Sequence, residues 1–129
     1  MTTRKNIASS SPWEEVVGYS RAVRVGNIVE VAGTTASDGD QVIGKGNLYV
    51  QTKFIFQKIE KALKEAGASL EDVVRTRMFV TDISKWEDAG KAHAEFFKSI
   101  KPVATMVEVS RLIHPDLLIE IEVTAILKS

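Results

Sequence analysis

The chain has 129 residues, of which 44% are hydrophobic and 26% charged, a balance typical of one globular domain. Its 17 basic and 17 acidic residues cancel, so the net charge gives no indication of nucleic acid as a partner. The absence of cysteine excludes disulfides, thiolate nucleophiles and sulfur metal ligands. With no apolar run long enough for a membrane span, we expect a single cytoplasmic domain over residues 1–129, in which residues 1–12 form a loosely held arm.

The first half of the chain is typical of a β-hairpin followed by a long helix. Two β-rich runs, residues 20–25 and 28–32, flank Gly26-Asn27, a pair suited to the positive φ angles of a tight turn. Glycines at positions 39, 44 and 46 then mark a loop. From residue 47 to residue 66 apolar side chains recur at three- and four-residue spacing, and Gly67 ends this pattern, which predicts an amphipathic helix.

The second half predicts a strand, a helix and two further strands. Residues 73–80 alternate as a strand with one covered face would, and Ser84 to Glu87 has the spacing of a capping box that starts a helix. Two apolar runs near residues 104–109 and 118–127 complete the chain. The order β-β-α-β-α-β-β predicts an α+β fold in which a single mixed sheet carries two helices on one face.

The other face of this sheet carries charge. In the last strand Glu120 and Glu122 alternate with isoleucine and valine, and Arg75 and Arg77 would supply counter-charges if they share that face. A symmetric oligomer could bury such a face with its charges paired. We therefore expect an oligomer.

Few residues stand out as candidates for chemistry. Nucleotide-binding, zinc-protease and serine-hydrolase motifs are missing from the sequence, and the spacing of His93 and His114 gives no metal signature, so we expect no metal and no cofactor. His93 lies on the apolar stripe of the second helix, where a hydrogen-bonded histidine at an interface is favoured over a general base. Glu120 and Glu122 are either ion-paired, which is favoured, or held in a cleft where burial raises the pKa enough for acid–base chemistry.

Several stretches together resemble the Rid (YjgF, reactive-intermediate deaminase) family: GYSRAVRVGNIVEVAG, ALKEAGASLEDVVRTRMFVTD, PVATMVEVSRL and IEIEVTAI. The resemblance runs from about residue 17 to residue 127. It implies a chorismate-mutase-like fold assembled as a homotrimer, with three small-molecule clefts between subunits. It also implies hydrolysis of enamines and imines, such as 2-aminoacrylate, without a cofactor.

The site residues of that family carry over unevenly. The resemblance implies binding roles for Tyr19 and Gly33, and it implies that Glu120 positions the attacking water. Ala104 stands where the family has the arginine that clamps the substrate carboxylate, and a methyl group cannot replace those charge-assisted hydrogen bonds. Further positions that depart from the family or line the same expected cleft are Ala32, Trp86, Gly90, His93, Thr105 and Met106.

These departures predict a roomier and more apolar cleft that is lined by Trp86 and His93 and binds a small metabolite without a 2-carboxylate. Deamination of 2-aminoacrylate itself is then not expected. One alternative is a non-catalytic trimer that senses a ligand or binds a partner. A less favoured alternative is an endoribonuclease or translation inhibitor, because the chain has no basic stripe interleaved with aromatic residues.

Overall fold

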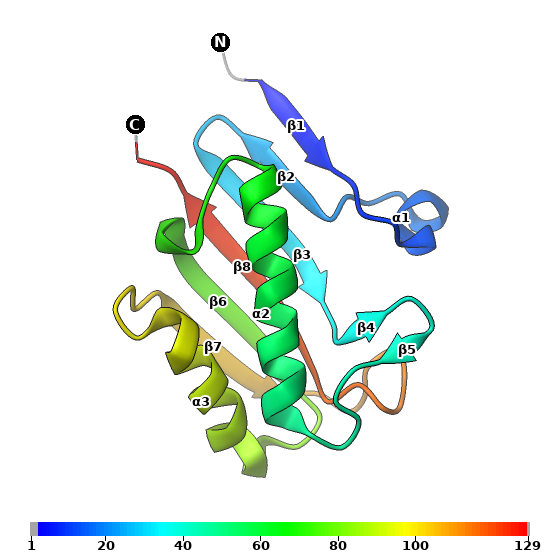
Figure 1. The fold of residues 1–129 in the computed structure, drawn as a ribbon. Coiled ribbons are helices and arrows are strands. Elements are labelled where there is room, and N and C mark those ends of the chain that lie inside the picture. Colours follow the sequence, from blue (N-terminus) through cyan, green and yellow to red (C-terminus); the bar gives the residue numbers. More distant parts are fainter. Residues whose placement is uncertain (1–2, 129) are drawn as a thin grey trace.

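The computed structural model describes residues 3–128, and six strands in it form one mixed sheet (Figure 1). The strand order across the sheet is β1-β2-β3-β8-β6-β7. Neighbouring strands run antiparallel, except that β6 and β7 are parallel and are joined through a helix. The strands are β1 (Arg4–Ile7), β2 (Ala22–Val25), β3 (Ile28–Thr34), β6 (Val73–Val80), β7 (Val103–Glu108) and β8 (Ile119–Ile126).

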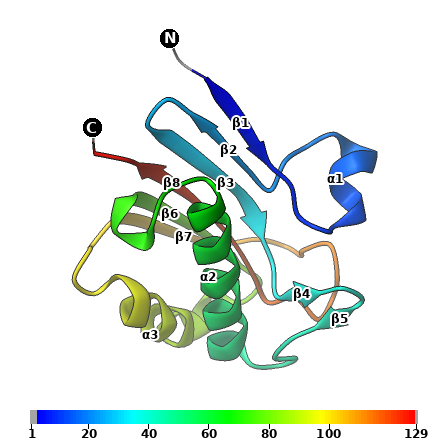
Figure 2. The ribbon, with the colours of Figure 1, turned by 45° about the horizontal axis from the view of Figure 1, so that its top comes forward.

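Two long helices, α2 (Leu48–Glu65) and α3 (Trp86–Phe97), lie on the same face of this sheet (Figure 2). Apolar residues of α2 at helical spacing, including Ile55, Phe56 and Ile59, are fully buried against it. On β8 the residues at alternate positions from Ile119 are buried, as expected for a strand with one covered face. The architecture is therefore the α+β single sheet with two helices on one face that the sequence predicts. None of the helices among residues 3–128 is long and apolar enough to span a membrane.

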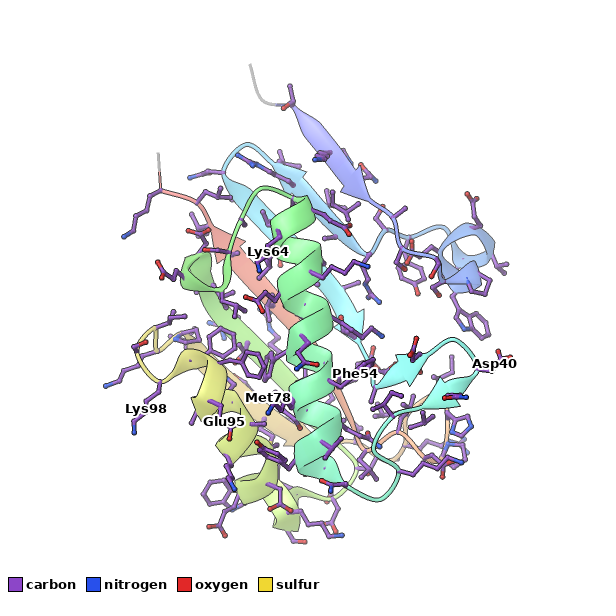
Figure 3. The ribbon with its side chains drawn as sticks, in the orientation of Figure 1. Asp40, Phe54, Lys64, Met78, Glu95 and Lys98 are labelled. Atoms are coloured by element: carbon purple, nitrogen blue, oxygen red, sulfur yellow. The ribbon has the colours of Figure 1, made fainter. Side chains whose placement is uncertain are left out.

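Side chains separate clearly between the two faces of the helical layer. Met78 points from β6 into the space beneath α2 and α3 and is 5% exposed (Figure 3). Glu95 and Lys98, on and after α3, lie on the outer surface together with Lys64 of α2. The hydrophobic core is thus the layer between the two helices and the sheet.

The N-terminal segment differs from the expected loose arm. Residues 4–7 form β1, which pairs along its whole length with β2, and Ile7 is 5% exposed. Lys5 Nζ donates a hydrogen bond to the carbonyl oxygen of Glu65 at the end of α2, 2.9 Å away. A short helix, α1 (Pro12–Val17), follows and is capped by Ser11. A four-residue strand at a sheet edge is too short to show a clear period in the sequence, and its lysine is typical of protected edges. Residues 1 and 2 of the expected arm lie outside the described residues.

Two local expectations in the middle of the chain also differ. The glycine-marked loop contains a small hairpin of β4 (Ser37–Asp38) and β5 (Gln41–Val42). The expected capping box from Ser84 to Glu87 is wrong, because Asp82 caps a 3-10 turn over Ile83–Lys85 and α3 begins only at Trp86. Ser84 donates its hydroxyl to the same Asp82 carboxylate, which leaves it unable to cap α3.

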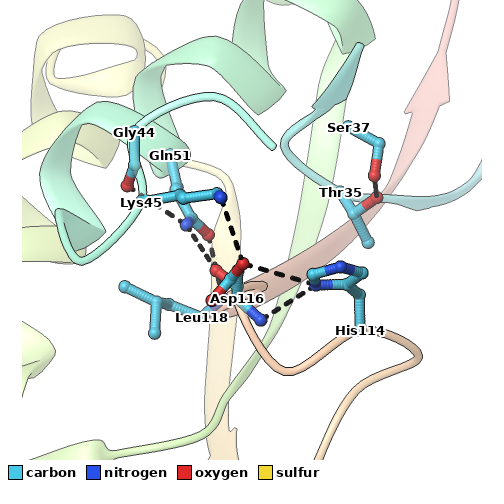
Figure 4. A network of polar contacts seen from close by, with 8 residues as sticks. All are labelled: Thr35, Ser37, Gly44, Lys45, Gln51, His114, Asp116 and Leu118. Carbon is cyan, nitrogen blue, oxygen red and sulfur yellow. Dashed lines mark hydrogen bonds and ion pairs between the residues drawn. The ribbon is translucent and has the colours of Figure 1, made fainter. Parts of the chain in front are cut away.

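A buried glutamine on α2 fixes the point at which β8 begins (Figure 4). Gln51 Nε2 donates to the carbonyl oxygens of Gly44 and Asp116, at 3.2 and 2.9 Å, and Gln51 Oε1 accepts from the backbone N–H of Leu118 at 2.8 Å. Gln51 is fully buried, so these three bonds satisfy its amide where water cannot reach it. Leu118, which directly precedes β8 and lies two residues before Glu120, is thereby tied to the helix layer.

Candidate functional site

Glu120 projects from β8 onto the face of the sheet that the helices leave open. Its neighbours Ile119 and Ile121 are fully buried on the opposite face, so the pleat of the strand turns the carboxylate away from α2 and α3. The register between β3 and β8 shifts between Val31 and Thr34, which brings the irregular part of β3 beside Glu120. A Cβ atom on residue 33 would overlap Glu120 Oε2, so the absence of a side chain at Gly33 makes the space in which this carboxylate lies.

Arg21 supplies the positive charge that acts on the Glu120 carboxylate. Its Nη2 donates to the carbonyl oxygen of Gly33 at 2.6 Å, so the guanidinium binds the backbone of the residue next to which the Glu120 carboxylate lies. Burial raises the pKa of Glu120, the positive charge of Arg21 opposes this rise, and the negative charge of Glu122 adds to it. The net rise moves the pKa of this carboxyl group toward neutral pH, which favours a role in acid–base chemistry.

Tyr19 borders a hollow on the open face. It follows α1 in the chain, is 38% exposed and lies at the edge of a cavity of about 810 Å³ between the N-terminal segment and the sheet. Ala32 of β3 and Glu122 of β8 line the same cavity. Glu122 also pairs with Arg77, Nη1 to Oε1 3.6 Å, which confirms that this arginine shares the face of the glutamates.

Ala104 and Met106 lie two strands from Glu120 and belong to the other face. On the parallel edge strand β7 they stand level with Thr76 and Met78 of β6, both of which are buried beneath the helices. Met106 is partly buried and packs against the core, whereas Ala104 is exposed at the edge of the sheet. Thr105, between them, is level with Arg77 and therefore faces the open side.

His93 is held between α3 and the sheet close to Ala104. Its Nε2 lies 2.9 Å from Thr76 Oγ1, and Thr76 is the residue of β6 that stands level with Ala104. The imidazole packs edge-on against Phe56, with ring centroids 5.6 Å apart, and lies 4.9 Å from the ring of Phe97. Burial lowers the pKa of His93, so the neutral ring is favoured.

Trp86 is the first residue of α3 and is 55% exposed. A Cβ atom on Gly90 would lie 3.8 Å from Trp86 Cε3, so the indole covers the side of the helix where glycine stands. The exposed indole therefore presents an apolar surface at the first turn of α3.

Within one subunit the expected site residues therefore form two groups. The carboxylate group comprises Gly33 and Glu120 on the open face, and the edge group comprises His93, Ala104 and Met106 on the helix side. Tyr19 lines the cavity that Glu122 also lines, and Trp86 stands at the start of α3. β6 separates β8 from β7, and the two groups project from opposite faces. Thr105 shares the open face with the carboxylate group but stands on the far edge strand.

The sequence analysis missed Arg21. Continuing the alternation of β2 backward from Val23, which is level with Glu30 on the open face, would have placed Arg21 on that face as well. Its proximity to Glu120 depends on the irregular pairing of β3, which has no sequence signature. Among residues 3–128, no three histidine, aspartate or glutamate side chains gather in an arrangement that could hold a metal ion.

Comparison with known sequences identifies relatives that span nearly the whole chain. The family model described as Endoribonuclease L-PSP matches residues 9–127. "Uncharacterized protein SCO2049" of Streptomyces coelicolor is 41% identical over 121 residues, which cover 94% of this chain and 90% of that protein. "3-aminoacrylate deaminase RutC" of Acinetobacter baylyi is 34% identical over 104 residues, which cover 80% of this chain and 82% of that enzyme.

A solved structure agrees with both the fold and these relatives. Rv2704 from Mycobacterium tuberculosis, described as a member of the YjgF/YER057c/UK114 family, superposes with a TM-score of 0.88 at 50% sequence identity. The match covers 97% of this chain and 100% of that one. The motifs that resemble the Rid family, the matched model and the shared fold thus lead to one conclusion: the chain belongs to the endoribonuclease L-PSP family, the YjgF or Rid family.

Proposed function

We propose that this protein is a homotrimer whose intersubunit clefts bind a small metabolite and hydrolyse a C=N bond in it, with Glu120 orienting the attacking water. The relative named as a 3-aminoacrylate deaminase supports deamination as the reaction class. The single observation that carries the proposal is the half-buried carboxylate of Glu120 over Gly33.

The chemistry follows from the position of that carboxylate. A carboxylate whose pKa is raised by burial can take a proton from water as the water oxygen bonds to the imine carbon, and can give that proton to the nitrogen to form a carbinolamine. It can then move the hydroxyl proton to the nitrogen, so that the C–N bond breaks and leaves a carbonyl product and free ammonia or amine. The raised pKa makes these transfers less costly near neutral pH than for a fully solvated glutamate. Glu122, on the same strand and face, instead forms an ion pair with Arg77.

A trimer would join the two groups of site residues that one subunit keeps apart. The open face and the edge strand β7 carry exposed apolar side chains that a neighbouring copy would cover: Val25, Ile28, Val103, Val107 and Ile126. If β7 of one copy lies against the open face of the next, Ala104 and Met106 approach Glu120 from a second chain. Sedimentation equilibrium should give three times the subunit mass, and a stable monomer at micromolar concentration would contradict this assembly.

The substrate class follows from what the edge group lacks. Ala104 offers no hydrogen-bond donor, so a carboxylate next to the reacting carbon would lose two charge-assisted bonds, each contributing about 1.5–3 kcal/mol. The exposed indole of Trp86, which covers the side of α3 at Gly90, instead presents apolar area. We therefore assign the cleft to imines or enamines with an uncharged, apolar substituent.

The deciding experiment is ammonia or amine release from freshly generated imines, in a panel that pairs 2-imino acids with carboxylate-free imines of the same size. The wild type should accelerate hydrolysis of the carboxylate-free members and leave 2-aminoacrylate at its uncatalysed rate. Glu120→Gln should abolish the acceleration, whereas Glu122→Gln, on the same strand and face, should retain most of it. Rapid turnover of 2-aminoacrylate would sink the substrate assignment, and equal activity of Glu120→Gln would sink the catalytic role.

Ribonuclease activity is the second candidate, because the matching family model carries that description. The net charge of zero gives little electrostatic attraction for a polyanion. Incubation of purified wild type and Glu120→Gln with single-stranded RNA separates the two functions. Cleavage that disappears in the variant would establish a nuclease, and cleavage that persists would be attributed to a contaminant.

A further inference from the structure

Arg21 has an unusual position for an arginine on a sheet face. It lies just before β2, with its backbone already in the ladder: its N–H donates to the carbonyl oxygen of Ile7 at 2.8 Å and its carbonyl accepts from Ala32 at 3.0 Å. The chain is therefore fixed at this residue. The side chain then reaches Gly33, whose carbonyl oxygen it binds at 2.6 Å.

The guanidinium keeps unused hydrogen-bonding capacity in a partly buried place. Arginine carries five N–H donors, and in residues 3–128 the only side-chain hydrogen bond of Arg21 is the one to Gly33. Among the residues that the structure describes, none accepts a hydrogen bond from its buried Nε, and leaving a buried donor unsatisfied costs free energy. Arg24, three residues on, shows the alternative: its guanidinium donates to Gly26 and Ala66 from the helix face.

The charged groups around Glu120 indicate a role for the positive charge of Arg21. Glu122 of β8 is negative and lies on the same face, whereas Phe79, level with Glu120 on β6, is neutral. Arg21 is the cation that acts on Glu120, and its positive charge also lowers the pKa of Lys58 of α2 after burial has done so. Lys58 donates to the carbonyl oxygens of Thr35 and Ser37, both at 2.9 Å, and so holds the chain that follows Gly33.

We propose that Arg21 is a positioning residue for the reacting carboxylate: it clamps the Gly33 carbonyl beneath Glu120 and supplies the positive charge that stabilises the Glu120 anion. This role rests on the proposed function, in which Glu120 acts on water. The positive charge of Arg21 lowers the pKa of Glu120, whereas burial and the charge of Glu122 raise it, so Arg21 favours the ionised carboxylate that can accept a proton.

The test is the ¹³C carboxyl titration of Glu120, followed by NMR in glutamate-labelled protein and assigned with Glu120→Gln. In Arg21→Gln the titration midpoint should rise by about 0.5–1 pH unit, and in Arg21→Lys, which keeps the charge, it should stay near the wild type. Arg24→Gln is the matched control and should leave the midpoint unchanged. Arg21→Met is a second neutral variant that keeps the aliphatic stem, so either folded variant decides the result.

An unchanged midpoint in the neutral variants, or an equal rise in Arg24→Gln, would overturn the proposal. The titration needs no substrate, so its outcome is separate from that of the proposed function. If hydrolysis is observed, the acid limb of its pH–rate profile should move upward with the midpoint in Arg21→Gln. If no imine is hydrolysed but the midpoint moves, the proposed function fails while the electrostatic role of Arg21 stands.

Discussion

The carboxylate of Glu120 lies in the space that a side chain at position 33 would fill. Gly33 and Glu120 are on adjacent strands, and the register shift in β3 puts them close together. Gly33 does not adopt a left-handed backbone conformation, so glycine is required here for space rather than for backbone freedom. The requirement links a local irregularity of one strand to the placement of the candidate catalytic group on the next.

Gly33→Ala should therefore impair function more than folding. The backbone tolerates alanine, but the Glu120 side chain must turn out of its position, at a cost of about 0.5–1.5 kcal/mol. We expect at least a tenfold loss of kcat/KM on the substrate found in the imine panel, with a small fall in thermal stability. The control is a double-mutant cycle: in a Glu120→Ala background the same change should cost almost nothing in stability. A full cost in that background would show that the clash is with another group.

Ala104→Arg tests whether the carboxylate clamp is the missing part of a 2-imino acid deaminase. Ala104 is exposed at the edge of the sheet, so an arginine can be accommodated without displacing the core. We expect a measurable gain in 2-aminoacrylate hydrolysis, because the new guanidinium can bind the substrate carboxylate through two hydrogen bonds. Thr105→Arg is the matched control, since it adds the same charge to the opposite face. No gain in Ala104→Arg would implicate Ala32 or Gly90, and an equal gain in both variants would show that the charge acts nonspecifically.

The sheet and the two long helices could be predicted because their signals are periodic and extend over many residues. The apolar spacing from residue 47 to residue 66 and the alternation in β8 each follow from burial on one side. The N-terminal strand has four residues, of which Ile7 alone is buried, so no period is visible. Before α3, both Asp82 and Ser84 have side chains that can cap a helix. Asp82 caps the 3-10 turn that precedes α3 and also accepts the hydroxyl of Ser84, so Ser84 does not cap α3.

The candidate site was less predictable because it depends on contacts between strands. Resemblance identified Glu120 and Gly33, yet the sequence could not show that one occupies the space left by the other. Arg21 became visible only when the irregular end of β3 placed the Gly33 carbonyl within its reach. The opposite orientation of Ala104 and Glu120 likewise follows from the register of β6 with its two neighbours.

His93 should make stability depend on pH in the weakly acidic range. Burial lowers the pKa of the folded-state imidazole below its usual value of 6.5, so the unfolded chain binds a proton that the folded one resists. Its stabilising contribution is present above pH 6.5 and is lost as the pH falls through the folded pKa. The fall in Tm from pH 7.5 to pH 5.5 should therefore be smaller in His93→Gln than in the wild type. His114→Gln, which alters an exposed loop histidine, should behave as the wild type does. An equal fall in all three proteins would place the acid sensitivity elsewhere.

Glu120 should make the stability of the fold fall as the pH rises, because its ionised form is unfavourable in the folded protein. The pKa of Glu120 is raised in the folded protein, so the protonated form is favoured and its stabilising contribution is lost as the pH rises through that value. Glu120→Gln, which keeps the shape without the charge, should raise the Tm at pH 7 by about 2 °C or more. The gain should shrink as the pH falls and the wild-type carboxyl group takes up its proton. Glu122→Gln should give no such gain, because it removes the partner of Arg77.

Scanning fluorimetry from pH 4.5 to pH 8 measures the Tm of the wild type and of both variants. A destabilised Glu120→Gln would mean that Arg21 stabilises this carboxylate by more than burial costs, whereas a stabilised and inactive variant is the result expected of a residue retained for chemistry.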